Sequence, residues 1–338
     1  MEKIKSPRNS TVEALRFLSV FQICLWHMSF PVTAAGFLGV EFFFILAGIF
    51  MYKNACTPNS PGVLSYTTSK LQKFYFKIVL ALIFTHVIYY EGIIAEFHEN
   101  WIHPILRFLS ELLLLQSIGT FEPGLNNPIW FFSTLIYGGA IVYALTKYYS
   151  KVSIRIIFPI ISIFYFAYIF QNGSSESLEN WDVINFIPLS MARGVSEIGF
   201  GVVVGYLFFN YKDVLQHNVK YLNIVAIISL ILYLAIVIGN RQYSQYALIF
   251  IPVLICTSLI QDSIFSKIFK GNLWLFLGRL SFDIYIIHYP LIAIFRHFLL
   301  VDAGLPLWLV ATLYYMSLVP AAYVFNIVSV KLQKVLFR

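Results

Sequence analysis

Runs of about 20 apolar residues recur along almost the whole chain, and they constrain its fold more than any other feature. In a lipid bilayer every backbone polar group must be satisfied internally, so a spanning segment is either a helix or a strand of a closed barrel. The runs are continuous and do not alternate polar with apolar residues, which favours helices. Of the 338 residues, 59% are hydrophobic and 12% are charged, which excludes an ordinary soluble domain. We predict an all-α polytopic membrane protein with one domain, residues 1–338.

Hydropathy indicates eleven candidate segments, of which we expect ten to cross the membrane. The exception is 104–119, which is short and contains Arg107 and Glu111, as a re-entrant or interfacial helix would. If it crossed, the basic residues within 147–155 would lie outside, against the positive-inside rule. With ten crossings, both termini are cytoplasmic. The expected crossings are 12–30, 36–52, 75–93, 129–147, 153–171, 185–209, 219–238, 244–262, 279–299 and 307–330.

The charge and cysteine content exclude several other classes. The formal net charge of +7 fits basic cytoplasmic loops and does not indicate nucleic-acid binding. Cys24, Cys56 and Cys256 are scattered and indicate neither a disulfide framework nor a metal site, so we expect no metal. The basic N-terminus precedes an apolar run without a small-residue cleavage site, so we interpret 12–30 as a retained helix.

Arg16 and His27 are the ionisable residues of the first expected helix. Such residues cost several kcal/mol in a membrane unless paired, so each marks a candidate functional site. Eleven residues at 100° each place the two on one helix face, about 16 Å apart along the axis. With a cytoplasmic N-terminus, Arg16 lies near the inner surface and His27 in the outer half. The alternative is that Arg16 snorkels to the interface while His27 bonds a neighbouring carbonyl.

Glu41 begins the second expected helix, which returns from outside to inside, so it lies near the depth of His27. A carboxylate beside an imidazole would fix its tautomer and suit it to act as a general base. The alternative is that Glu41 pairs with another cation or lies at the wetted surface.

Lys70 and Lys73 precede the third expected helix on the cytoplasmic side. They would either attract anionic lipid headgroups or bind the phosphates of a cytoplasmic cofactor. Ser281, Tyr285 and His288 share one face of a late helix, where they would line the bundle interior or form interhelical hydrogen bonds.

Together these motifs resemble the membrane acyltransferase family 3, whose members O-acylate cell-surface sugars and other acceptors. Arg16 and His27 match that family's arginine, ten residues, histidine motif. "FLGVEFFFILAGIF" is similar to its "GV(D/E)xFFxxSG" helix, with Glu41 at the acidic position and Ala47 where serine is usual.

The resemblance continues to the end of the chain in the expected order. Lys70 and Lys73 match a basic pair before the third helix, where the family often has arginine. "LGRLSFDIYIIHYPL" resembles its late "lGxxSYxxYLxHxP" helix, with Ser281, Tyr285 and His288 at the matching places.

Two departures narrow the resemblance. The peptidoglycan and lipopolysaccharide branch often has a glutamate pair after the tryptophan of the fifth segment, and Leu135 and Ile136 stand there instead. No SGNH hydrolase-like domain follows the last expected helix, so we expect the stand-alone type, which completes transfer itself or passes the acyl group to a separate protein.

The resemblance implies a multi-pass O-acyltransferase of the inner (cytoplasmic) membrane that modifies cell-envelope polysaccharide. It would move an acyl group, expected to be acetyl, from cytoplasmic acyl-CoA to a hydroxyl of a cell-surface or lipid-linked sugar. His27 would be the general base, oriented by Glu41, or a transient acyl carrier. The acetyl-CoA phosphates would be bound by Arg16, Lys70 and Lys73. The substrate or the site would be supported by Trp130, Ser281, Tyr285 and His288. We assign no role to His86, Arg193 and Glu197.

Two other classes compete with this interpretation. A transporter or flippase of a glycan or lipid precursor also carries intramembrane charges, but it would be favoured by inverted repeats or broken helices, which the sequence does not show. A polysaccharide polymerase would be expected to have a large external loop, which is missing here.

Overall fold

The computed structural model describes residues 8–28, 33–119, 124–172, 183–184, 187–239 and 241–336. Within these ranges the chain is helical apart from connecting turns and one antiparallel pair of two-residue strands, β1 (Val183–Ile184) and β2 (Ile187–Pro188). The long helices are α1 (Ser10–His27), α2 (Gly39–Ala55), α3 (Val63–Ile88), α4 (Tyr90–Glu99), α5 (Ile102–Leu112), α6 (Trp130–Tyr148), α8 (Phe158–Asn172), α9 (Leu189–His217), α10 (Val219–Gly239), α11 (Ala247–Ser258), α13 (Asn272–Ile294) and α14 (Leu307–Leu336). The short helices are α7 (Ser150–Val152) and α12 (Ile264–Ile268).

Eight helices of the described chain are long and apolar enough to cross a membrane, judged by length and composition. They correspond to eight of the ten expected crossings, and the other two contain α1 and α11. α1 carries Glu13, Arg16 and His27, whereas α11 has 12 residues and is about 18 Å long, which is less than the hydrocarbon thickness. The helical, multi-pass class is confirmed. Ten crossings with both termini cytoplasmic stay a prediction.

Some helix boundaries differ from the expected segments. α3 begins at Val63 instead of near 75, because its first turns are polar and hydropathy detects only the apolar part. The expected non-crossing segment 104–119 divides into most of α5, from Pro104 to Leu112, and a separate turn of 3-10 helix at Gln116–Ile118. Positions 29–30 and 185–186 of two expected segments lie outside the described residues.

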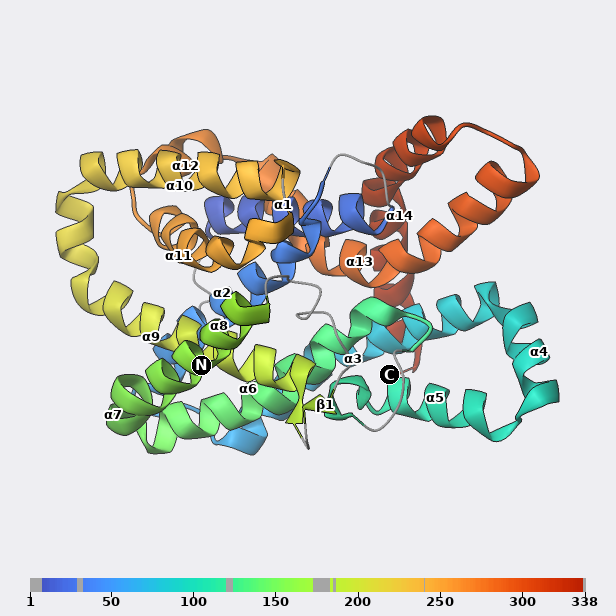
Figure 1. The fold of residues 1–338 in the computed structure, drawn as a ribbon, viewed down its shortest axis with the longest axis horizontal. Coiled ribbons are helices and arrows are strands. Elements are labelled where there is room, and N and C mark those ends of the chain that lie inside the picture. Colours follow the sequence, from blue (N-terminus) through green and yellow to red (C-terminus); the bar gives the residue numbers. More distant parts are fainter. Residues whose placement is uncertain are drawn as a thin grey trace.

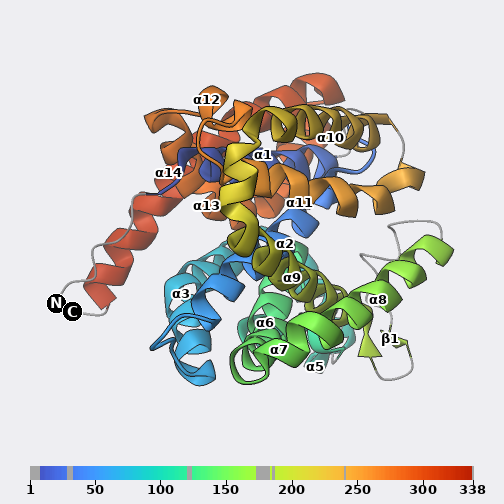
Figure 2. The same ribbon diagram turned by 90° about the vertical axis from the view of Figure 1, so that its left-hand side faces the viewer.

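The helices form two halves joined by α2 and α9. Figures 1 and 2 show α1, α10, α11, α13 and α14 in one half and α3, α6, α7 and α8 in the other, with α9 running from one half into the other. The most extensive packing is between α2 and α9 and between α1 and α13. The candidate residues of the first, second and late helices are therefore neighbours at the centre of the protein.

Two glycines allow these central helices to approach closely. A Cβ atom on Gly48 of α2 would overlap the carbonyl oxygen of Ile198 in α9. A Cβ atom on Gly278 of α13 would overlap Glu13 of α1. Small residues at such crossings are typical of helix packing in membranes. Because Glu13 meets Gly278 and His27 meets His288 further along, α1 and α13 run parallel.

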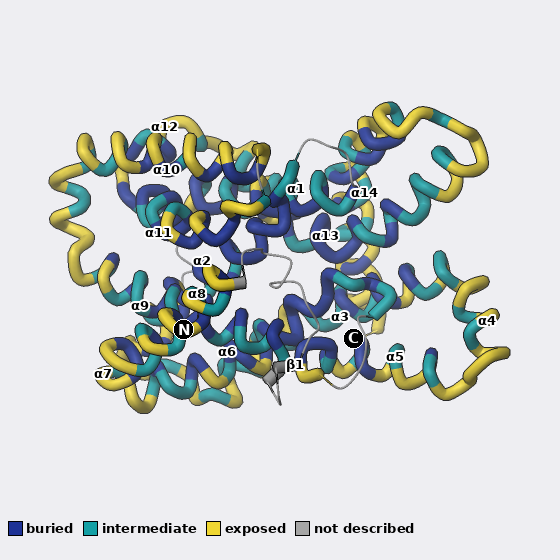
Figure 3. Tube along the Cα trace, viewed as in Figure 1, coloured by how far each residue is buried: buried dark blue, intermediate teal, exposed yellow. Residues whose placement is uncertain are grey.

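Many apolar side chains are exposed on the surface of the helix bundle, and several ionisable side chains are buried within its core. Figure 3 shows buried residues concentrated along α1, α2 and α13 and exposed ones along α4 and the outer side of α10. The exposed side chains of α10 include Ile224, Ile228 and Ile231, as expected for a lipid-facing helix. The buried ionisable residues include Glu13, Glu41, Glu111, Arg193, Glu197, Asp283 and His288.

Candidate active site

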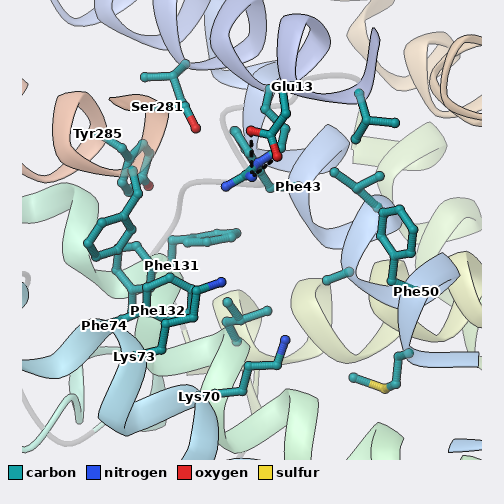
Figure 4. A pocket seen from close by; sticks show the side chains of 18 of the residues that line it. Glu13, Phe43, Phe50, Lys70, Lys73, Phe74, Phe131, Phe132, Ser281 and Tyr285 are labelled. Carbon is teal, nitrogen blue, oxygen red and sulfur yellow. Dashed lines mark hydrogen bonds and ion pairs between the residues drawn. The ribbon is translucent and has the colours of Figure 1, made fainter. Parts of the chain in front are cut away.

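A cavity of about 450 Å³ lies between α1, α2, α3, α6 and α13. Arg16, Lys70 and Lys73 all line it, so the structure brings together the three residues expected to bind phosphates. In Figure 4 the ammonium groups of Lys70 and Lys73 point into the cavity from α3, opposite Glu13 and Ser281. Residues from the start of α1 and the start of α3 therefore form one cationic mouth.

The mouth keeps an excess of positive charge. Arg16 Nη1 donates hydrogen bonds to both carboxylate oxygens of Glu13, at 3.2 and 3.1 Å. Lys70 Nζ lies 5.2 Å from the ring centre of Tyr66, and Lys73 Nζ lies 4.8 Å from that of Phe74. Such cation–π contacts hold a lysine in place without cancelling its charge.

An adjoining recess of about 340 Å³ shares Arg16 and Lys73 with the mouth. Lys77 lines this recess, and its Nζ donates a hydrogen bond of 2.6 Å to Asp283 Oδ1. The other oxygen of Asp283 accepts a hydrogen bond of 2.7 Å from Asn326 Nδ2. The Asp283 carboxylate thus neutralises Lys77, while the charge of Lys73 remains available in the cationic mouth.

The inner wall of the cavity is aromatic. The ring centres of Phe131 and Phe132 each lie 5.7 Å from that of Tyr285. The Tyr285 hydroxyl donates a 2.9 Å hydrogen bond to the carbonyl of Pro128, and the Ser281 hydroxyl donates a 2.7 Å hydrogen bond to that of Gly278. Only the Tyr285 bond reaches another segment of the chain, as the alternative of interhelical hydrogen bonding expects; the Ser281 bond lies within α13. Both side chains also line the cavity.

A second, smaller cavity of about 50 Å³ lies beyond Tyr285. It is lined by His27, Trp130, Arg193 and Tyr285, among others. Tyr285 lines both cavities and so forms part of the wall between them. Arg16 and His27, at opposite ends of α1, therefore face two different cavities that share one side chain.

Glu41 has a different partner from the one expected. Its Oε1 accepts a 2.6 Å hydrogen bond from Arg193 Nη2, and Arg193 Nε lies 3.6 Å from Glu197 Oε1. All three side chains are fully buried. Glu41 therefore pairs with Arg193 and not with the His27 imidazole, in agreement with the alternative that it pairs with another cation. The reason is tertiary, because Arg193 lies on α9, 152 residues further along the chain.

Arg193 is the functional candidate that sequence reasoning missed. Its guanidinium lies 5.2 Å from the ring centre of Trp130 and lines the same small cavity as His27. The available signal was the spacing of Arg193 and Glu197, four residues apart in an apolar helix. That spacing indicates an ion pair within one helix but contains no information about Glu41 or His27.

His27 lies among aromatic rings. The ring centres of Trp26, His288 and Tyr289 lie 4.6, 5.1 and 5.7 Å from its own. His288 is fully buried and hydrogen-bonds the carbonyl of Tyr285 through Nδ1. The three residues of the late stripe thus have separate positions: Ser281 at the mouth, Tyr285 between the cavities and His288 beside His27.

Comparison with known proteins identifies the family of the chain. Residues 9–327 match the family model described as an acyltransferase domain, of acyltransferase family 3. No curated protein and no solved structure gives a match. The family model covers nearly the whole chain. The chain therefore belongs to the membrane acyltransferase family 3.

Proposed function

We propose that this acyltransferase moves an acetyl group from cytoplasmic acetyl-CoA to a hydroxyl of a cell-surface or lipid-linked sugar. On this proposal the protein lies in the inner membrane with ten crossings and both termini cytoplasmic, so the cationic mouth faces the cytoplasm. The product would be an O-acetylated polysaccharide of the cell envelope. A separate acyl-accepting protein is a further candidate acceptor.

The observation that carries the proposal is the succession of two cavities along α1. Arg16, Lys70 and Lys73 surround a space of about 450 Å³, and His27 faces the next space beyond Tyr285. The phosphates of coenzyme A carry too much charge to enter lipid and would stay at the mouth, where lysine and arginine are suitable partners. The pantetheine arm would extend past the aromatic wall, and this would place the thioester near Tyr285.

His27 would act as the general base. It would take the proton of the acceptor hydroxyl while the hydroxyl oxygen attacks the thioester carbonyl. The tetrahedral intermediate would collapse with cleavage of the carbon–sulfur bond, and the departing thiolate of coenzyme A would receive the proton. A donor substrate is consumed in this scheme, and no metal is required.

Arg193 would stabilise the negative charge that develops on the thioester oxygen. It lines the cavity that His27 also lines, and Glu41 and Glu197 fix it from behind. A preorganised cation in a buried site is worth far more to such a transition state than one in water.

The first experiment measures thiol release from acetyl-CoA by protein purified in detergent, with and without candidate sugars. We expect His27→Ala to abolish thiol release while the thermal unfolding midpoint stays near that of the wild type. His297→Ala is the matched control, because that histidine side chain is 63% exposed. Near-normal activity of the folded His27→Ala protein would overturn the role of His27. A transporter or flippase would leave the thioester intact.

The acceptor is found by a second measurement. Mass spectrometry of surface glycans from cells with and without the gene should show an acetyl group that is lost with the gene. An unchanged glycan profile would argue against a surface sugar as the acceptor.

A further inference from the structure

His288 is a second imidazole, and its ring is a direct neighbour of the proposed base. Its ring centre lies 5.1 Å from that of His27, and the two ring planes are tilted by 44°. Of the described residues that line the small cavity, His27 is one and His288 is not. His288 is fully buried and packs against His27 without lining that cavity.

The hydrogen bond of His288 within its own helix decides its tautomer. Nδ1 contacts the carbonyl oxygen of Tyr285 at 2.5 Å, and because a carbonyl only accepts hydrogen bonds, Nδ1 carries the hydrogen. In a neutral imidazole the other nitrogen is then an acceptor. Within the described chain, Nε2 of His288 is buried and has no hydrogen-bond partner. A buried acceptor without a partner is costly, so a donor is expected close by.

His27 can be that donor, and the next question is which groups around it can accept its hydrogen bond. Arg296 donates a 2.9 Å hydrogen bond to the carbonyl of Met28, and a guanidinium cannot accept a hydrogen bond from His27. Glu41 accepts from Arg193 through Oε1, and Glu41 is not among the described residues that line the small cavity with His27. Two acceptors of the described chain belong to rings packed against His27: Nε2 of His288, whose ring centre lies 5.1 Å away, and the hydroxyl of Tyr289, whose ring centre lies 5.7 Å away. Oδ1 of Asn127, which lines the small cavity with His27, is a third buried acceptor without a hydrogen-bond partner, but it lies on the cavity side where the acceptor hydroxyl would bind.

We propose that His288 is a positioning residue that accepts a hydrogen bond from His27 and thereby fixes the tautomer in which the opposite nitrogen of His27 faces the cavity as the base. The inference rests on the proposed role of His27. A third group behind the base holds the imidazole in catalytic triads in the same way, usually as a carboxylate. Hydrogen bonds of a catalytic base are often long or poorly aligned before substrate binds and tighten in the complex with substrate.

The test compares two substitutions of His288. Glutamine can place an amide oxygen where Nε2 lies and so keeps an acceptor, whereas leucine fills similar space without one. We expect His288→Leu to lower kcat for acetyl transfer by about 10²- to 10³-fold and to leave the KM for acetyl-CoA within about twofold. His288→Gln should retain kcat within about tenfold of the wild type. His297→Gln is the exposed control and should leave both parameters unchanged.

The outcomes separate this inference from the proposed function. Normal kcat in folded His288→Leu, or equal losses in the leucine and glutamine variants, would overturn the role of His288 while leaving that of His27 intact. If Tyr289→Phe lowers kcat and His288→Leu does not, the tyrosine hydroxyl is the acceptor and the inference is wrong. If His288→Leu does not fold, His288→Gln decides. A loss of kcat above about 10²-fold in folded His288→Gln contradicts the inference, because glutamine keeps the acceptor. Wild-type protein without thiol release, or an active His27→Ala variant, overturns the proposed function and this inference together.

Discussion

Replacing Glu41 by glutamine should destabilise the protein, and the cost follows from the buried cluster around Arg193. The Glu41 carboxylate accepts a 2.6 Å hydrogen bond from Arg193, and Glu197 lies 3.6 Å from the same guanidinium. Removing one partner of a buried ion pair costs about 3–5 kcal/mol when the other charge is left uncompensated. Here Glu197 remains as a partner and glutamine keeps an acceptor oxygen. We therefore expect a loss of about 1.5–3 kcal/mol in the free energy of unfolding, the range for hydrogen bonds to charged groups.

The cluster also predicts which of its three residues costs the most stability when it is replaced. One guanidinium can neutralise only one of the two carboxylates, so Glu197→Gln removes surplus negative charge and should cost less than about 1 kcal/mol. Arg193→Met leaves two buried carboxyl groups facing each other and should cost the most, about 3–5 kcal/mol.

The measurement is the free energy of unfolding of detergent-solubilised protein titrated with sodium dodecyl sulfate and followed by tryptophan fluorescence. Glu99→Gln on the exposed end of α4 is the matched control, and it should change the free energy by less than about 0.5 kcal/mol. Wild-type stability in Glu41→Gln, or a larger loss in Glu197→Gln than in Glu41→Gln, would refute the assignment of Glu41 as the main partner of Arg193.

Two further predictions concern the mouth and the region around α5. Lys73→Ala should raise the KM for acetyl-CoA by about tenfold, the effect of losing one charge-assisted phosphate contact, and should change kcat less. Steady-state assays measure both parameters, with Lys334→Ala on the exposed end of α14 as the control. A change confined to kcat would contradict phosphate binding. Burial raises the pKa of Glu111, outside the candidate spans, from 4.5 to about 7, an effect partly offset by the hydrogen bond from the backbone N–H of Asn126. The neutral carboxyl is thus favoured in the folded state. Its contribution to the free energy of unfolding, at most about 3 kcal/mol, is fully present below pH 4.5 and is lost as the pH rises through about 7. Glu111→Gln should remove that slope from unfolding measured between pH 4.5 and 8, and an unchanged slope would contradict the prediction.

The local sequence predicts which residues form the cationic mouth, but it does not predict the length of the helix that carries two of them. The sequence singles out Arg16 by its place in an apolar segment eleven residues before His27, and Lys70 and Lys73 as the basic pair of "KLQK"; all three line one cavity. The extension of α3 back to Val63, which carries both lysines, was missed. Hydropathy responds to the part of a helix that lies in lipid, whereas backbone hydrogen bonding continues through its polar turns.

The sequence by itself determined that the chain is a helical membrane protein, because continuous apolar runs leave the backbone no other way to satisfy its polar groups in lipid. It also determined which helix faces carry Arg16, His27 and the late polar stripe, because those follow from helical periodicity. Only the tertiary structure decided which side chains from different helices meet. Glu41 pairs with Arg193, 152 residues away, and His27 meets His288 on α13. Such pairings depend on the rotation, depth and close approach of neighbouring helices, which no local pattern contains.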